Sequence, residues 1–174
     1  DHIAADIKWI RDRIGGKPFG IDLVLPASVP EERTVEQLIA EIPQTHRDFE
    51  QKIKRKYNVP DPKQAPDLHI WGGLDQKRAL AQVEVVFDER VPVFASGLGS
   101  PAFLLKRAHQ LGMQVWGLVG KPKQAKKQIA AGTDVIIAQG FDAAGHTGNI
   151  GTFSIVPQIA DAARAAGVPV LAAG

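Results

Sequence analysis

The second half of the chain alternates between short apolar runs and amphipathic segments. The apolar runs lie at residues 91–95, 114–118, 134–138 and 169–173. Helical segments between them begin near Pro101, Lys123 and Ser154. Apolar runs without polar alternation are typical of parallel strands that are buried on both faces. The pattern predicts an α/β fold, and by itself it suits both an open doubly wound sheet and a closed eightfold barrel.

The first half begins with the same elements and is then interrupted. Isoleucine recurs at helical spacing from Ile3 to Ile14, and residues 19–25 read as a short strand. Thr34, Thr45 and Asp75 are positioned to cap polar helices before the next strand. We expect a helical insertion at about 29–74, which serves as a lid or as a contact in a homodimer.

Composition excludes several classes of protein. The chain has 174 residues, with 21 Lys and Arg against 19 Asp and Glu, and its net charge of +2 gives no nucleic-acid footprint. No apolar run approaches the ~18 residues of a membrane span. There is no Cys, which fits a reducing compartment, so we expect a cytoplasmic protein. No metal-ligand cluster is evident. The basic runs at 52–56 and 121–127 are interpreted as solvated helix faces.

The longest connection in the regular half follows the apolar run that ends at Ala138. Spacings between successive strand starts (91, 114, 134 and 169) are 23, 20 and 35 residues, so roughly 15 extra residues follow that strand. Functional sites of parallel α/β folds lie at the carboxyl ends of their strands. The extra segment contains four Gly and one His, His146, whose side chain is of the type that titrates near neutral pH. Asp142 either orients His146 or caps a turn. A phosphate site at Gly97–Pro101 is the weaker candidate.

Several motifs together carry a resemblance to a known family. They are Lys17–Leu23, Ala131–Ile137, Ala138–Gly148, Val156–Gln158 and Pro169–Gly174. The chain resembles nitronate monooxygenases, formerly called 2-nitropropane dioxygenases. The likeness spans most of the chain apart from the helical insertion, and the segment from Gln139 to His146 is its most specific part.

The resemblance implies an FMN-dependent (β/α)8 TIM barrel that oxidises alkyl nitronates, such as propionate 3-nitronate, with molecular oxygen. His146 then matches the catalytic histidine, acting as a base or as a stabiliser of the substrate anion. Gln139 and Gly145 match positions that line the flavin, and Gly174 matches the first glycine of a phosphate-binding turn. Asp22 stands where many members have Asn beside the isoalloxazine. Two further departures are Asp142 for Glu and Ala144 for Gly.

Measured against such a barrel, the chain is an incomplete piece. It supplies about five of eight parallel strands, whereas a barrel of this type usually has ~250 residues. We therefore expect residues 1–174 to form a partial FMN-binding barrel domain that by itself binds FMN weakly and is inactive. The expected partners of the intact protein are a small-molecule substrate and oxygen, with no nucleic acid and no membrane.

Two alternatives stay open at this point. A flavin-dependent enoyl-ACP reductase resembles the same barrel and motif, but it requires a reduced nicotinamide as electron donor. A truncated copy that retains the motif without catalysis is the second alternative. Three measurements distinguish these possibilities. Oxygen uptake with a nitronate favours the nitronate monooxygenase, and NADH oxidation with a crotonyl thioester favours the enoyl reductase. Flavin absorbance in the intact protein argues against a non-catalytic copy.

Overall fold

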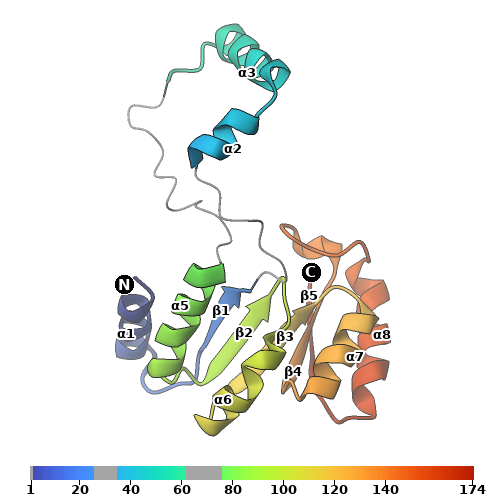
Figure 1. The fold of residues 1–174 in the computed structure, drawn as a ribbon. Helices are drawn as coiled ribbons and strands as arrows, with labels where there is room; N and C mark the ends of the chain where they lie inside the picture. The colour runs from blue at the N-terminus through green and yellow to red at the C-terminus, as the bar shows by residue number, and fades with distance from the viewer. Residues whose placement is uncertain (1, 26–34, 62–75) are drawn as a thin grey trace. The chain divides into compact units, whose positions relative to one another are not determined.

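A computed structural model describes residues 2–25, 35–61 and 76–174 of the chain (Figure 1). The chain divides into two compact units. One consists of Asp1–Ser28 together with Gln76–Gly174, and the other is Val29–Asp75. The expected sites all fall in the first unit, so its architecture determines their positions.

Five parallel strands form the sheet of the first unit. They are β1 (Gly20–Val24), β2 (Val93–Gly97), β3 (Gln114–Val119), β4 (Val135–Gln139) and β5 (Val170–Ala173). Their spatial order is their chain order, and each strand pairs with the next. A doubly wound sheet reverses its strand order at a switch point, whereas a barrel adds each strand beside the previous one. The strand order therefore identifies this sheet as part of the wall of a (β/α) barrel and not as a doubly wound sheet.

Helices follow the strands in alternation. They are α1 (His2–Ile14), α5 (Gln76–Asp88), α6 (Leu105–Gln110), α7 (Pro122–Ala131) and α8 (Thr152–Arg164). Two short 3-10 turns, η1 (Pro101–Phe103) and η2 (Phe141–Ala143), precede α6 and α8. The helix expected at Pro101 thus starts as a 3-10 turn, in which the Ser100 hydroxyl accepts a hydrogen bond from the Ala102 N–H at 3.4 Å.

Alternate residues of each strand face the helices and form the core. One cluster gathers around Phe87 and Phe94, whose rings meet edge to face at 5.6 Å. A second cluster joins Ile136 of β4 to Ile155 and Ile159 of α8. All five of these side chains are almost completely buried. Because neighbouring residues of a strand point to opposite faces, the remaining strand residues are left on the other face of the sheet.

The second unit contains α2 (Val35–Glu41) and α3 (Gln44–Tyr57). Helix α3 begins one residue before Thr45, so the predicted cap lies inside its first turn, and Pro43 occupies the cap position without a side-chain hydrogen bond. The other two predicted caps, Thr34 and Asp75, lie outside the described residues. Phe49 and Tyr57 of α3 are each 63% exposed, so the described part of this unit has no large apolar core around them.

Candidate active site

The carboxyl ends of β2, β3 and β4 surround a cavity of about 570 Å³. Its walls come from the loops that follow these three strands. The lining residues are Leu98, Gly99, Ser100, Leu118, Val119, Gly120, Lys121, Gln124, Lys127, Gln128, Gln139, His146, Thr147 and Gly148. None of them is acidic. The cavity lies at the edge of the sheet where barrel folds carry their sites.

The loop that carries His146 is held against its neighbours by close backbone contacts. A Cβ atom added to Gly148 would lie 2.8 Å from the carbonyl oxygen of Gly120, so the β3 and β4 loops meet backbone to backbone. The Phe141 N–H donates a hydrogen bond to the Ile150 carbonyl at 3.0 Å, which closes the base of the loop. These contacts fold the loop back over the cavity and require glycine at the point of closest approach.

Asp142 caps a helix and does not orient His146. Its carboxylate accepts a hydrogen bond from the backbone N–H of Thr152, the first residue of α8, at 2.7 Å. That hydrogen bond lowers the pKa of the Asp142 carboxyl below its ordinary value. The residue that precedes α8, Gly151, has no side chain to cap the helix, so Asp142 supplies the missing acceptor from ten residues earlier in the chain.

The backbone just before His146 adopts conformations that favour glycine. Gly145 has φ 68° and faces open space, in keeping with its residue type. Ala144 has φ 60° and ψ 177°, a region that is essentially reserved for glycine. The methyl of Ala144 therefore costs conformational strain at the position where the family resemblance leads us to expect glycine. Local backbone strain of this kind is common at functional sites.

The predicted site residues fall into more than one place. Gln139 and His146 line the same cavity, and the His146 side chain is exposed at its edge. Gly145 lies directly beside His146 in the loop but does not line the cavity. Asp22 lies elsewhere, in a cavity of about 730 Å³ on the sheet face that the helices leave open. Leu118 lines both cavities, so the two adjoin at β3.

The Asp22 carboxyl has an environment of its own. The residue keeps an exposed surface, yet the protein atoms around the carboxyl partly remove water from it and raise its pKa above the ordinary value. Asp22 pairs in register with Ala95, and Trp116 follows on the next strand. A carboxyl on this face is therefore easier to protonate than one in water.

Gly174 follows β5 and contacts the start of α8. A Cβ atom on Gly174 would lie 1.9 Å from the Thr152 hydroxyl oxygen, and one on Gly140 would lie 2.2 Å from the same atom. Thr152 thus occupies a space that two glycines leave free. Its hydroxyl oxygen is buried and has no hydrogen-bond partner within the part of the chain that the structure describes. A buried unpaired hydroxyl beside Gly174 is a hydrogen-bonding group that a ligand can use.

Four residues of α7 and its cap line the cavity without having been predicted to do so, and three of them fall in the run 121–127, which was interpreted as a solvated helix face. Lys121 and Gln124 lie at the first turn of α7, and Lys127 and Gln128 follow one turn later. The available signal was Gly120-Lys121-Pro122 directly after a strand, because a helix that begins there has its amino end at the functional edge.

The described residues contain no group of three or more His, Cys, Asp or Glu side chains with metal-site geometry. None of the described helices combines the length and the apolar character needed to cross a bilayer.

A parallel sheet in barrel order with a glycine-lined cavity at its carboxyl edge defines the (β/α) barrel class of fold. Within that class, the chain matches the nitronate monooxygenase family over residues 1–174, and it belongs to this family.

Relatives and solved structures agree with this assignment. A Mycobacterium tuberculosis protein whose name describes it as a monooxygenase is 35% identical over 99% of this chain and 47% of its own length. A Staphylococcus aureus protein named as a nitronate monooxygenase is 30% identical over 58% of this chain and 30% of its own length. An indene-carboxyl-CoA dehydrogenase of M. tuberculosis is 37% identical over 53% of this chain and 26% of its own length. The chain spans less than half the length of these relatives.

Among solved structures, nitroalkane oxidase from Streptomyces ansochromogenes matches with a TM-score of 0.69 and 25% identity, over 98% of this chain and 46% of that one. FabK from Thermotoga maritima matches with a TM-score of 0.62 and 21% identity, over 97% of this chain and 37% of that one. The likeness to FabK concerns the fold alone. The chain covers less than half of each of these two solved chains.

Proposed function

We propose that the intact protein is a flavin-dependent oxidase of alkyl nitronates, with FMN as its cofactor and molecular oxygen as the oxidant. Residues 1–174 then form part of an FMN-binding barrel domain that carries a helical insertion at about 29–74. The observation that carries the proposal is the joint presence of His146 and Gln139 in one glycine-lined cavity at the carboxyl ends of parallel strands. Family membership supports the same chemistry.

The cavity residues suit a flavin. A volume of about 570 Å³ lies within the roughly 300–1,000 Å³ of small-molecule and cofactor sites. Gly99, Gly120 and Gly148 offer backbone without side chains, which lets a planar ring approach closely. In this proposal Gln139 and Gly145 line the flavin ring, Asp22 lies beside the ring, and Gly174 begins the turn that binds the phosphate.

Bound FMN would supply the electron transfer that no protein side chain provides. The protein's own contribution is made by His146. Its imidazole accepts the proton from the carbon beside the nitro group of a nitroalkane, or hydrogen-bonds the nitro oxygens of a preformed nitronate. The Gly120–Gly148 contact holds the histidine loop over the cavity, and the Asp142 cap fixes the loop to α8. The contacts that fix the loop therefore also fix the position from which His146 meets the substrate.

The test is His146→Asn in the intact protein, which keeps a polar side chain but removes the base. Turnover of a neutral nitroalkane should fall by ~100-fold or more, because proton abstraction is lost. Turnover of the matching nitronate should fall much less, since Asn still donates a hydrogen bond. Oxygen uptake measures both reactions. Equal losses on both substrates would remove the base role, and NADH oxidation with a crotonyl thioester in place of oxygen uptake would favour an enoyl reductase.

We further propose that the intact enzyme works in the cytoplasm and that the insertion contributes to a homodimer or to a lid. The exposed rings of Phe49 and Tyr57 on α3 support a role in covering another surface. Sedimentation of the intact protein before and after removal of residues 29–74 separates the two roles, because only the loss of a dimer contact changes the number of protomers in the particle.

A further inference from the structure

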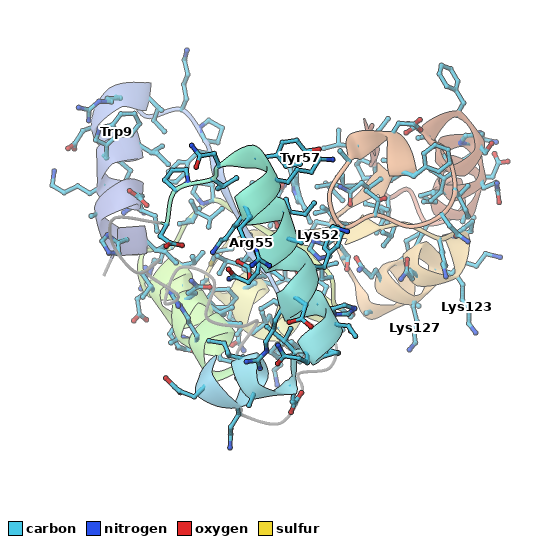
Figure 2. All side chains as sticks on the ribbon, turned by 90° about the horizontal axis from the view of Figure 1, so that it is seen from above. Trp9, Lys52, Arg55, Tyr57, Lys123 and Lys127 are labelled. Atoms are coloured by element: carbon cyan, nitrogen blue, oxygen red, sulfur yellow. The ribbon has the colours of Figure 1, made fainter. Side chains whose placement is uncertain are left out.

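A basic rim, defined as Lys121, Lys123, Lys126 and Lys127, lies at the edge of the His146 cavity and on the adjoining surface of α7. Lys121 and Lys127 are among the residues that line the cavity, and Lys123 and Lys126 lie beside it on the helix. Figure 2 shows Lys123 and Lys127 extending from α7 into solvent. The rim therefore continues from the cavity onto the outer surface of the helix.

The charges of the basic rim are not neutralised nearby. No Asp or Glu occurs in the sequence between Glu89 and Asp134. Arg107, in the same stretch, pairs with Glu84 at 2.6 Å, whereas the four lysines have no ion-pair partner among the described residues. In α3, by contrast, Lys54 pairs with Glu50 at 2.9 Å. An excess of positive charge at the cavity mouth attracts anions.

The amino end of α7 adds to this field. The helix has ten residues, and its cap position is held by Lys121 without a side-chain hydrogen bond. Its first helical residue, Pro122, has no N–H, and the positive end of the helix dipole points toward the carboxyl edge of the sheet. The Gly120 N–H is already used, since it donates to the Gln124 side-chain oxygen at 3.0 Å. Anion binding here would therefore depend mainly on the lysine side chains.

A buried amide in the cavity wall has an unused hydrogen-bonding atom. Gln128 is 4% exposed, and its side-chain oxygen has no partner among the described residues. The amide lies over Gly117 of β3, where any Cβ atom would lie 1.5 Å from that oxygen. A buried polar atom without a partner is costly unless something satisfies it. Because an amide oxygen only accepts, a donor group of a ligand, and not a phosphate oxygen, would be needed to satisfy it.

We propose that the basic rim binds the phosphate groups of a carrier to which the substrate's reacting part is attached. The inference rests on the proposed function in one respect, namely that the reacting part enters the His146 cavity. Lys123 and Lys127 lie about 6 Å apart along the helix axis, and the rim extends beyond the cavity. A single small carboxylate inside the cavity meets at most part of this rim, whereas a phosphorylated carrier lying across α7 meets the lysines inside and outside it.

The experiment uses the intact, flavin-loaded protein and free coenzyme A as the probe, with calorimetry as the readout. Coenzyme A should bind the wild type, and Lys121→Gln combined with Lys127→Gln should weaken binding by about tenfold or more. The control pair, Lys17→Gln with Arg90→Gln, removes the same charge at the opposite edge of the sheet and should leave the affinity unchanged. Added salt should weaken binding to the wild type more than to the double variant.

Four outcomes would overturn the inference. Coenzyme A fails to bind the wild type, or it binds the double variant as tightly as the wild type. In the third, the double variant loses affinity for FMN and not for coenzyme A, which would assign the lysines to the phosphate of the flavin. Inorganic pyrophosphate that binds as tightly as coenzyme A would also contradict a carrier site. Because calorimetry needs no turnover, these results are independent of whether nitronates are oxidised.

Discussion

In the part of the chain that the structure describes, a carboxylate is paired at the amino edge of the sheet and two lysines are unpaired at its carboxyl edge. At the amino edge, the Asp134 carboxylate accepts a hydrogen bond from the Val115 N–H at 2.7 Å and pairs with His109 at 2.9 Å. At the carboxyl edge, Lys121 and Lys127 border the cavity and have no ion-pair partner among the described residues. Ala144 adds backbone strain at the same edge. Paired groups stabilise the fold, while unpaired and strained groups are typical of a site that receives a ligand.

The largest effect should come from the closest backbone contact at the carboxyl edge. In Gly140→Ala, the new Cβ would lie 2.3 Å from the backbone nitrogen of Thr152, and the backbone must shift to relieve the overlap. We expect a loss of about 3 kcal/mol in the free energy of unfolding. Denaturant unfolding measures it. Gly97→Ala is the control, because its Cβ meets only the Leu118 side chain at 3.7 Å. Equal free energies of unfolding for the two variants would contradict the close contact between Gly140 and Thr152.

A second prediction concerns the amino edge. Asp134→Ala removes the acceptor of the Val115 N–H and leaves His109 without its partner. The free energy of unfolding should fall by about 2 kcal/mol, with no change in kcat/KM, since the residue is far from the cavity lining. Asp161→Ala breaks an exposed pair with Arg164 and should cost less than ~0.5 kcal/mol. A fall in kcat/KM on Asp134→Ala would contradict the division of roles between the edges.

The smallest expected effect tests the strain before His146. Ala144→Gly places glycine in a conformation that it adopts freely, so the free energy of unfolding should rise by about 1 kcal/mol. The affinity for FMN should rise as well, because the loop then adopts its conformation without backbone strain at residue 144. Ala143→Gly, one residue earlier in η2, should instead lower stability slightly. Changes of opposite sign in the free energy of unfolding of the two variants support backbone strain at Ala144, and changes of the same sign contradict it.

Much of the fold could be predicted from local patterns. Each strand of the regular half lies within two residues of its predicted bounds. Strand β2 starts at Val93 and not at 91, because Pro92 has no N–H for the ladder. Ser100-Pro101 marked a helix start correctly but not its type, since the same cap residues begin 3-10 and α-helical turns. Strand order could not be read from the sequence, because the rhythm of elements is the same in a barrel and in a doubly wound sheet.

The candidate site was only partly predictable. The length and the glycine content of the connection after Ala138 predicted that the loop of His146 carries the site. Both can be read from the sequence without knowing how the strands pack. The lysines of α7 carry no such signal, since a charged helix surface looks the same whether it faces solvent or a cavity. Asp22 and Gln139 come from strands that are not neighbours, and the separate cavities in which they lie depend on packing across β2 and β3. Roles given to these residues by family resemblance stay predictions.

Leu118 borders both the cavity of His146 and the cavity of Asp22. Replacing this leucine by alanine removes three carbon atoms and leaves the backbone in place, so the same change enlarges both spaces at the strand that they share. The size of the molecule that fits beside His146 therefore depends on a strand residue as well as on the loops.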